Sequence, residues 1–193
     1  MTAAAPPQPL SAGAVVALAG RRPDAADATQ LRFPIQNAPR VLKELRVLLH
    51  PGVRALVCSA ACGADLLALE AAGEAGIERH VVLPFGRAEF RATSVVDRPG
   101  DWGPLYDRIL DELQGHGSLE LGTDDPEDPG TYFRANERIV RRALELAEDP
   151  DGPRPRAAVV AWEGAPRGDD DATEDFRRRA EAYGFTIHPV HTL

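Results

Sequence analysis

The segment AAVVAW, residues 157–162, is an apolar run that contains no charged residue. Such a run is typical of a strand that is buried on both faces, as the central strands of parallel sheets are. A polar loop follows it, then a helical stretch at 173–183 and a further strand at 186–190. The order strand, helix, strand predicts a βαβ unit at this end of the chain.

The same alternation extends back through the rest of the chain. Short apolar runs predict strands, and stretches with apolar residues at helical spacing predict the helices between them. The predicted strands are 14–19, 55–58, 80–84 and 118–121, and the predicted helices are 41–49, 64–75, 87–95, 105–114 and 132–147. The two helices after the third strand are expected to form one long crossover. The predicted fold class is α/β: a single doubly wound, Rossmann-like domain with a mostly parallel sheet.

Length and composition limit the domain organisation. A chain of 193 residues is long enough for one core and too short for two ordinary ones. Residues 1–13 are rich in Ala and Pro and lack periodicity, which predicts a disordered tail before a domain at 14–193. No apolar run approaches the roughly 20 residues of a membrane-spanning helix, so we expect a soluble, cytoplasmic protein without a membrane partner.

Charge and cysteine content exclude several classes of function. The 30 acidic and 22 basic residues give a net charge of -8, which disfavours general DNA or RNA binding but not a pocket for one nucleotide. The two cysteines, Cys58 and Cys62, have no second pair or His cluster nearby. We therefore predict neither a disulfide framework nor a metal site.

Candidate ligand-binding residues follow the predicted strands, because open parallel sheets bind ligands beyond the carboxyl ends of their strands. Gly20, Arg21 and Arg22 follow the first strand, where glycine permits a sharp turn and two guanidinium groups can grip a phosphate. The alternative interpretation is a glycine that ends the strand and two solvated arginines.

The second strand runs through the small residues Ser59, Ala61, Gly63 and Ala64 into a helix. Small side chains let backbone amides at a helix start approach an anionic ligand. Asp65, in the first turn, either contacts the ligand or complements the helix dipole.

Further candidates come from the later elements. Phe85 and Asn136 have both a core role and a ligand role open to them: a ring can pack or face a base, and a buried amide needs a hydrogen-bond partner. Asp171 or Thr173 can cap the helix that follows residues 157–162. The remaining candidates at these strand ends are Pro84, Trp162, Gly164, Gly168 and Thr173.

Taken in order, these motifs resemble those of the SLOG superfamily, Rossmann-like nucleotide-binding proteins that include the DprA group and the LOG phosphoribohydrolases. The resemblance is nearest to uncharacterised bacterial SLOG-like proteins and extends from residue 14 onward. The segments that carry it are GRR at 20–22, CSAACGAD at 58–65 with Glu70, VLPF at 82–85 with Phe90, Tyr132 with Asn136, and AWEG at 161–164.

The resemblance implies a nucleotide-binding domain, and two departures bear on its activity. Such proteins usually have Gly-Gly-Thr where this chain has residues 171–173, and they lay phosphate against those amides. Asp169, Asp170 and Asp171 now lie there, and at 4 Å two like charges repel by roughly 4 kcal/mol at an intermediate dielectric. We therefore expect this loop to repel a phosphate unless it turns outward or binds a cation. Phe176 stands where LOG enzymes supply a catalytic glutamate.

Three functions stay open from the sequence. The first is the binding or sensing of a nucleotide or an ADP-ribose- or NAD-like derivative; the sequence identifies no certain cofactor beside this possible nucleotide ligand. The second is LOG-type hydrolysis of a nucleotide N-glycosidic bond, with Asp65, Glu70 or Glu163 as acid or base. The third is a degenerate scaffold that binds nothing. The expected partner is a small-molecule nucleotide; self-association into a homo-oligomer stays open.

Overall fold

Six parallel strands form one sheet in the order β4-β3-β2-β1-β5-β6 in the computed structural model, which describes residues 7–193. All five strand pairings are parallel. The predicted α/β class is confirmed, and the sheet, which we expected to be mostly parallel, is parallel throughout. The strands are β1 (Val15–Gly20), β2 (Ala55–Cys58), β3 (Glu78–Leu83), β4 (Leu119–Leu121), β5 (Arg156–Trp162) and β6 (Thr186–His191).

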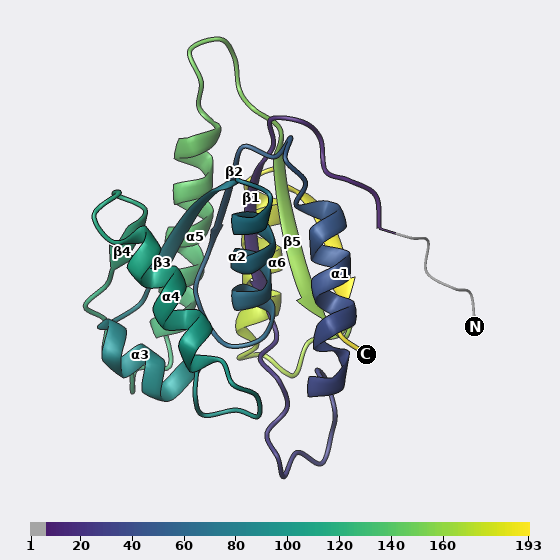
Figure 1. Ribbon diagram of the computed structural model, residues 1–193, viewed down its shortest axis with the longest axis vertical. Helices are drawn as coiled ribbons and strands as arrows, with labels where there is room; N and C mark the ends of the chain where they lie inside the picture. The colour runs from purple at the N-terminus through teal and green to yellow at the C-terminus, as the bar shows by residue number, and fades with distance from the viewer. Residues whose placement is uncertain (1–6) are drawn as a thin grey trace.

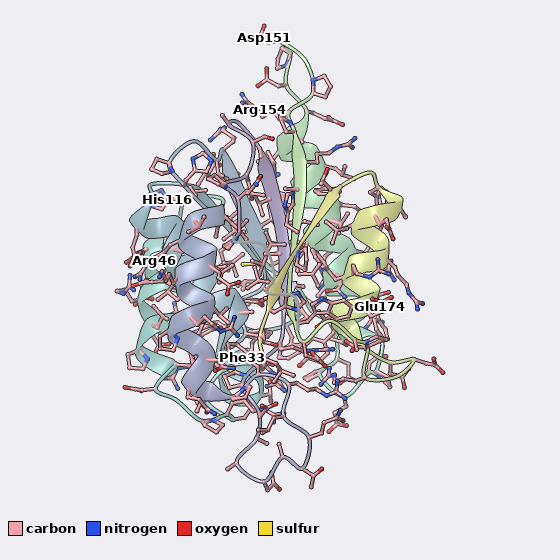
Figure 2. The ribbon with its side chains drawn as sticks, turned by 90° about the vertical axis from the view of Figure 1, so that its right-hand side faces the viewer. Phe33, Arg46, His116, Asp151, Arg154 and Glu174 are labelled. Atoms are coloured by element: carbon pink, nitrogen blue, oxygen red, sulfur yellow. The ribbon has the colours of Figure 1, made fainter. Side chains whose placement is uncertain are left out.

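Six α-helices cover the two faces of the sheet (Figure 1). They are α1 (Ala38–Leu48), α2 (Ala64–Glu74), α3 (Arg87–Ser94), α4 (Gly103–Leu113), α5 (Thr131–Ala147) and α6 (Ala172–Ala182), with a 3-10 turn, η1 (Ile35–Asn37), before α1. Figure 2 shows the sheet edge-on between α1 and α4 on one side and α5 and α6 on the other. α3 and α4 together connect β3 to β4, as the expected long crossover does.

The sequence explains which helix lies deepest. α2 is apolar on nearly its whole circumference, and eight of its residues, from Ala64 to Ala72, are buried. A helix that is apolar all round must be enclosed, and α2 packs between α1 and α4 on one face of the sheet. Asp65 is buried together with this helix.

The order of the strands places a crevice beside β1. β1 pairs with β2 on one side and with β5 on the other, so the chain builds outward to β4 and then returns to add β5 and β6. The connections that leave β1 and β5 therefore diverge to opposite faces of the sheet. This divergence is the topological switch point at which open α/β sheets bind ligands.

Ordered contacts begin before the expected domain start at residue 14. The side chain of Leu10 is buried, its amide donates to the carbonyl of Leu48, and its carbonyl accepts from the His50 ring. One apolar residue among prolines and serines gives no periodicity, which is why the sequence does not reveal this contact. The part of the predicted tail at residues 1–6 lies outside the described residues. Within residues 7–193, no helix is long and apolar enough to span a membrane.

Candidate functional site

A cavity of about 370 Å³ opens at the carboxyl end of β1. Its walls come from the loop at residues 21–34, the start of α2, the end of α3, one face of α5 and the first residues of α6. The loop at 21–34 hangs below the sheet in Figure 1. Figure 2 shows Phe33 and Glu174 near this end of the molecule and Asp151 and Arg154 at the opposite end.

The structure brings together about half of the predicted site residues. Those that line the cavity are Gly20, Arg21, Arg22, Ser59, Ala61, Asp65, Asn136 and Thr173. Those that do not line it are Gly63, Ala64, Pro84, Phe85, Trp162, Gly164 and Gly168, and the acid or base candidates Glu70 and Glu163. The candidates that follow β1 and β2, and Asn136 on α5, therefore meet at the cavity. The candidates at the ends of β3 and β5 do not line it.

Arg21 is buried and bound to carboxylates of its own chain. Its Nη1 and Nη2 donate to the two oxygens of Asp171 at 2.6 and 2.7 Å, and its Nε donates to Glu163 at 2.7 Å. A further bond runs from Nη2 to the carbonyl of Ala165, and the guanidinium lies 5.8 Å from the Trp162 ring centre. The guanidinium predicted to grip a phosphate thus holds the β5–α6 loop.

Asp171 occupies the N-terminus of α6, where the resemblance places phosphate. Its Oδ1 accepts from the amides of Thr173 and Glu174, and its Oδ2 accepts from the amide of Arg167 at 2.6 Å. The predicted capping role of Asp171 is confirmed. Although burial opposes ionisation, the bonds from Arg21 and the Arg167 amide lower the pKa of Asp171 to about 2. The negative charge of Asp171 is therefore stabilised by the Arg21 guanidinium and by backbone amides of the protein.

The glycines at this edge make room for the chain's own backbone. A Cβ on Gly20 would lie 2.5 Å from Cβ of Ala64 and 2.8 Å from Cβ of Ala161, so β1, α2 and β5 meet there at close range. Gly63 has a φ of +87°, and a Cβ there would lie 2.8 Å from the Arg21 carbonyl oxygen. These positions are explained by packing without any ligand.

Backbone amides at the start of α2 are also engaged within the protein. The amide of Ala64 donates to the carbonyl of Arg21, and that of Cys62 donates to the carbonyl of Ser94. The amide of Ala61 donates to Oδ2 of Asp65 at 3.3 Å. These bonds hold the loops around the cavity and leave these three amides unavailable to an anion.

Asp65 is the cavity-lining acid with the most perturbed ionisation. It is only 6% exposed, and among the described residues the amide of Ala61 is its one hydrogen-bond donor. Burial raises the pKa of Asp65 to about 7, against opposing effects of that amide and of Arg22. At neutral pH the group is therefore poised between a hydrogen-bond donor and an anionic acceptor.

Asn136 lines the cavity from α5 but directs its amide nitrogen elsewhere. Its Nδ2 donates to the carbonyl of Ala172 at 2.8 Å and to Asp175 at 2.9 Å, which ties α5 to α6. Among the described residues its Oδ1 makes no hydrogen bond. Nearby, the hydroxyls of Tyr132 and Ser94 lie 3.1 Å apart and join α5 to α3 at the cavity wall.

The other two acid candidates lie outside the cavity. Glu70 forms an exposed ion pair with Arg108 on the outer side of α2 and α4. Glu163 is buried between Arg21 and Arg32, and its bonds to these two arginines outweigh burial and lower its pKa. Phe85 is buried and packs on Phe90 at 5.6 Å, which is the core role rather than the ligand role.

The loop at 21–34 contributes more of the unpredicted lining than any other single segment. Asp24 orders this loop by accepting the amides of Arg32 and Phe33. The loop carries no motif, but a connection of this length at a switch point is itself a signal of function. The lining residues that the sequence did not indicate are Pro23, Asp24, Ala25, Ala28, Gln30 and Arg32 from this loop, and Ser94, Arg98, Ala135 and Ile139 from other elements. Phe90 and Tyr132, which carry the resemblance, and Arg167 and Ala172, which lie in the loop before α6 and at its start, also line the cavity.

No metal centre is found among residues 7–193, which contain no group of three His, Cys, Asp or Glu side chains placed to hold an ion. Cys58 and Cys62 are free and buried. Burial raises the pKa of both thiols, that of Cys62 to about 12, so neither is a reactive thiolate at neutral pH.

Comparison with known proteins finds similarity at the level of structure. The sequence matches no known protein family and no curated protein. Among solved structures, the chain is similar to DNA processing protein A (DprA) from Streptococcus pneumoniae, with 16% sequence identity and a TM-score of 0.41. The likeness covers 91% of this chain and 58% of that one, so the chain spans less than two thirds of that relative.

Proposed function

We propose that the protein binds a small nucleotide in the cavity beside β1. The observation that carries this proposal is the make-up of that cavity. One part is apolar, with Leu18, Ile139 and Phe90, and the rest carries arginines and hydroxyls. A base or sugar needs an apolar surface with a few polar contacts, and an anionic group needs cations. Both lie here at the switch point of a doubly wound sheet.

The size of the cavity favours one nucleotide over a dinucleotide. Its volume of about 370 Å³ lies near the lower end of the roughly 300–1,000 Å³ typical of small-molecule sites. A nucleoside monophosphate is therefore a better match than NAD or ADP-ribose. In addition, Asp65 and Oδ1 of Asn136 offer hydrogen-bonding groups to a base edge or a ribose.

A thermal-shift panel tests this proposal. The folded protein is heated with nucleosides, nucleoside mono- and diphosphates, NAD and ADP-ribose at millimolar concentration. At 100 times Kd a ligand stabilises the folded state by about 2.7 kcal/mol, so a true ligand gives a clear rise in Tm. Ile139→Trp, which fills the apolar part, should abolish the rise, whereas Val47→Trp on the half-exposed face of α1 should keep it.

No rise with any member of the panel would contradict nucleotide binding and support the scaffold alternative. Equal unfolding midpoints of the two variants without ligand are the control for folding. If Ile139→Trp is too unstable, Ala135→Leu narrows the same wall with a smaller change in volume.

Asp65 favours a second candidate function, hydrolysis of a nucleotide N-glycosidic bond. A carboxyl with a pKa of about 7 that lines the cavity can donate a proton to the departing base while water attacks C1′ of the ribose. The C1′–N bond breaks, water supplies the hydroxyl of the sugar product, and the second proton of that water passes to the Asp65 carboxylate by way of solvent, which restores the acid. Release of free base from nucleoside monophosphates, followed by chromatography, tests this function.

Two matched variants separate the acid candidates. Asp65→Asn should abolish base release, and Glu70→Gln should leave it unchanged because Glu70 lies on the outer side of α2. Base release that survives Asp65→Asn would contradict this assignment. Binding without base release would leave the protein as a binding module.

A further inference from the structure

Five arginines line the cavity, and they divide into two groups. Arg21, Arg22 and Arg32 donate hydrogen bonds to carboxylates of the protein. Arg98 and Arg167 line the same cavity, and no hydrogen bond among the described residues involves either guanidinium. The first group is occupied with structural partners, and the second group is not.

Each of these two arginines approaches a carboxylate that other groups already hold. Nε of Arg98 lies 3.3 Å from Oδ2 of Asp97 and is buried without a hydrogen-bond partner. Both oxygens of Asp97 accept from Arg22. Nε of Arg167 is 3.7 Å from Oδ2 of Asp171, beyond hydrogen-bond distance, and that oxygen already accepts from Arg21 and from the Arg167 amide.

The chain's net charge of -8 does not extend to the cavity. Its five arginines face five carboxyl groups: Asp97, Glu163 and Asp171 beside the arginines, and Asp24 and Asp65 in the lining. The formal charge is therefore +1 when Asp65 is protonated and zero when it is ionised. Burial together with the positive charges of Arg21 and Arg32 lowers the pKa of Arg167. An anion beside Arg167 would relieve this repulsion.

The usual position for a phosphate in such folds is closed here. Asp171 fills the N-terminus of α6 and takes the guanidinium of Arg21. The charge of an anionic ligand must therefore be met by other groups at the cavity. Arg98 follows α3 and Arg167 precedes α6, so the two reach the cavity from loops after β3 and β5, on either side of β1 and β2.

We propose that Arg98 and Arg167 bind the phosphate of a nucleoside monophosphate, in place of the amides of α6. This inference rests on the nucleotide-binding function proposed above and names the groups that select the phosphorylated ligand. Two charge-assisted contacts give such a ligand its preference over the bare nucleoside. Arg21 takes no part in ligand binding, because its donors are held by Asp171 and Glu163.

Calorimetric titration with the four common nucleosides and their 5′-monophosphates tests the inference. For the nucleotide that binds, wild type should prefer the monophosphate over its nucleoside by at least about tenfold. Arg98→Gln and Arg167→Gln should each reduce this ratio of Kd values, and the double variant should bring it within about twofold of one. The Kd for the nucleoside should stay the same. Arg142→Gln on α5 is the matched control and should keep the wild-type ratio, because Arg142 pairs with Glu145 and does not line the cavity.

Each other outcome has a definite meaning. A double variant that keeps the wild-type ratio overturns the inference, and so does a loss confined to one of the two single variants. If wild type binds nucleoside and monophosphate equally, the phosphate subsite is wrong while nucleotide-site binding stands. If neither binds to wild type, the proposed function itself fails.

Discussion

The carboxylate of Asp171 and the guanidinium of Arg21 form a buried two-point ion pair across 150 positions of sequence, with bonds of 2.6 and 2.7 Å. The Asp171 side chain is 0% exposed and that of Arg21 is 3% exposed. Because the same carboxylate caps α6, the pair joins β1 to the start of the last helix. Arg21, one member of the pair, lines the cavity.

Breaking this pair should destabilise the protein strongly. Removal of one partner leaves a buried charge without compensation, which typically costs about 3–5 kcal/mol. Asp171→Asn keeps the shape and one capping oxygen but loses the charge. We expect a fall of that size in the free energy of unfolding, measured by urea denaturation. Asp149→Asn, in an exposed loop with its own arginine partner, is the control and should cost less than about 1 kcal/mol.

Acid stability should follow from the same pair. The native pKa of Asp171 is lowered to about 2 from 3.8, so the folded state binds its proton less readily than the unfolded chain does. The stability that this group contributes is present above about pH 4 and is lost as the pH falls toward 2. The difference in unfolding free energy between wild type and Asp171→Asn should therefore shrink across this window. A constant difference from pH 5 to pH 2 would be evidence against the ionised pair.

A free anion should replace the Asp171 carboxylate when the side chain is removed. Asp171→Gly vacates the donors of Arg21 and of the α6 amides, which together suit phosphate. If the vacated site binds phosphate with a Kd near 1 mM, then 10 mM stabilises the variant by about 1.4 kcal/mol. Tm is compared in phosphate and in chloride at equal ionic strength. Wild type and Asp149→Gly should show no such difference, and its absence in Asp171→Gly would refute the replacement.

Local sequence patterns were sufficient for the elements and for the α/β class. The run at 157–162 becomes β5 with Arg156 added, and the stretch at 55–58 becomes β2 with the predicted bounds. Local patterns were sufficient because apolar periodicity is a property of consecutive residues. The order of the strands and the fully parallel pairing depend on contacts between distant segments, which no single stretch encodes.

The roles of the site residues also depend on contacts between distant segments, and more strongly than the strand order does. Arg21 follows a strand, as a phosphate-binding arginine would, but its partners stand 142 and 150 positions away. The residues next to Arg21 in the sequence do not indicate that Glu163 and Asp171 are its partners. Gly20 and Gly63 are predicted to bind a ligand, and the structure shows that both are also needed for the close approach of their backbone to neighbouring elements. The sequence predicted that these residues would meet at the carboxyl ends of the strands. It did not predict which of them would bind their own chain and which would stay available to a ligand.

Asp65 should make stability fall as the pH rises. Its native pKa is raised to about 7 from 3.8, so the folded state holds the proton more tightly than the unfolded chain. Stability is therefore highest below about pH 4 for this group and declines until about pH 7. The rise corresponds to about 4 kcal/mol at 1.36 kcal/mol per tenfold change in the proton-binding constant.

Asp65→Asn should remove this decline. At pH 8 the variant should be more stable than wild type, and at pH 4 the two should be nearly equal, as measured by urea unfolding at each pH. Glu70→Gln on the same helix is the control, since its carboxylate is solvent-accessible and paired with Arg108. An Asp65→Asn profile parallel to that of wild type between pH 4 and 8 would show that the native carboxyl titrates normally.

Gly20→Ala should disrupt the junction of β1, α2 and β5. The new methyl group would lie 2.5 Å from Cβ of Ala64 and 2.8 Å from both Cβ and the carbonyl oxygen of Ala161, and a backbone oxygen cannot move aside cheaply. Overpacking of this kind costs about 1–3 kcal/mol or more.

Gly86→Ala is the matched control, because a Cβ there meets nothing within 4 Å and its φ of -54° suits alanine. The free energies of unfolding of both variants are compared by urea denaturation, and since Gly20 also lines the cavity, ligand binding should weaken in Gly20→Ala alone. Equal stability of the two variants would mean that the three elements do not meet as closely as described.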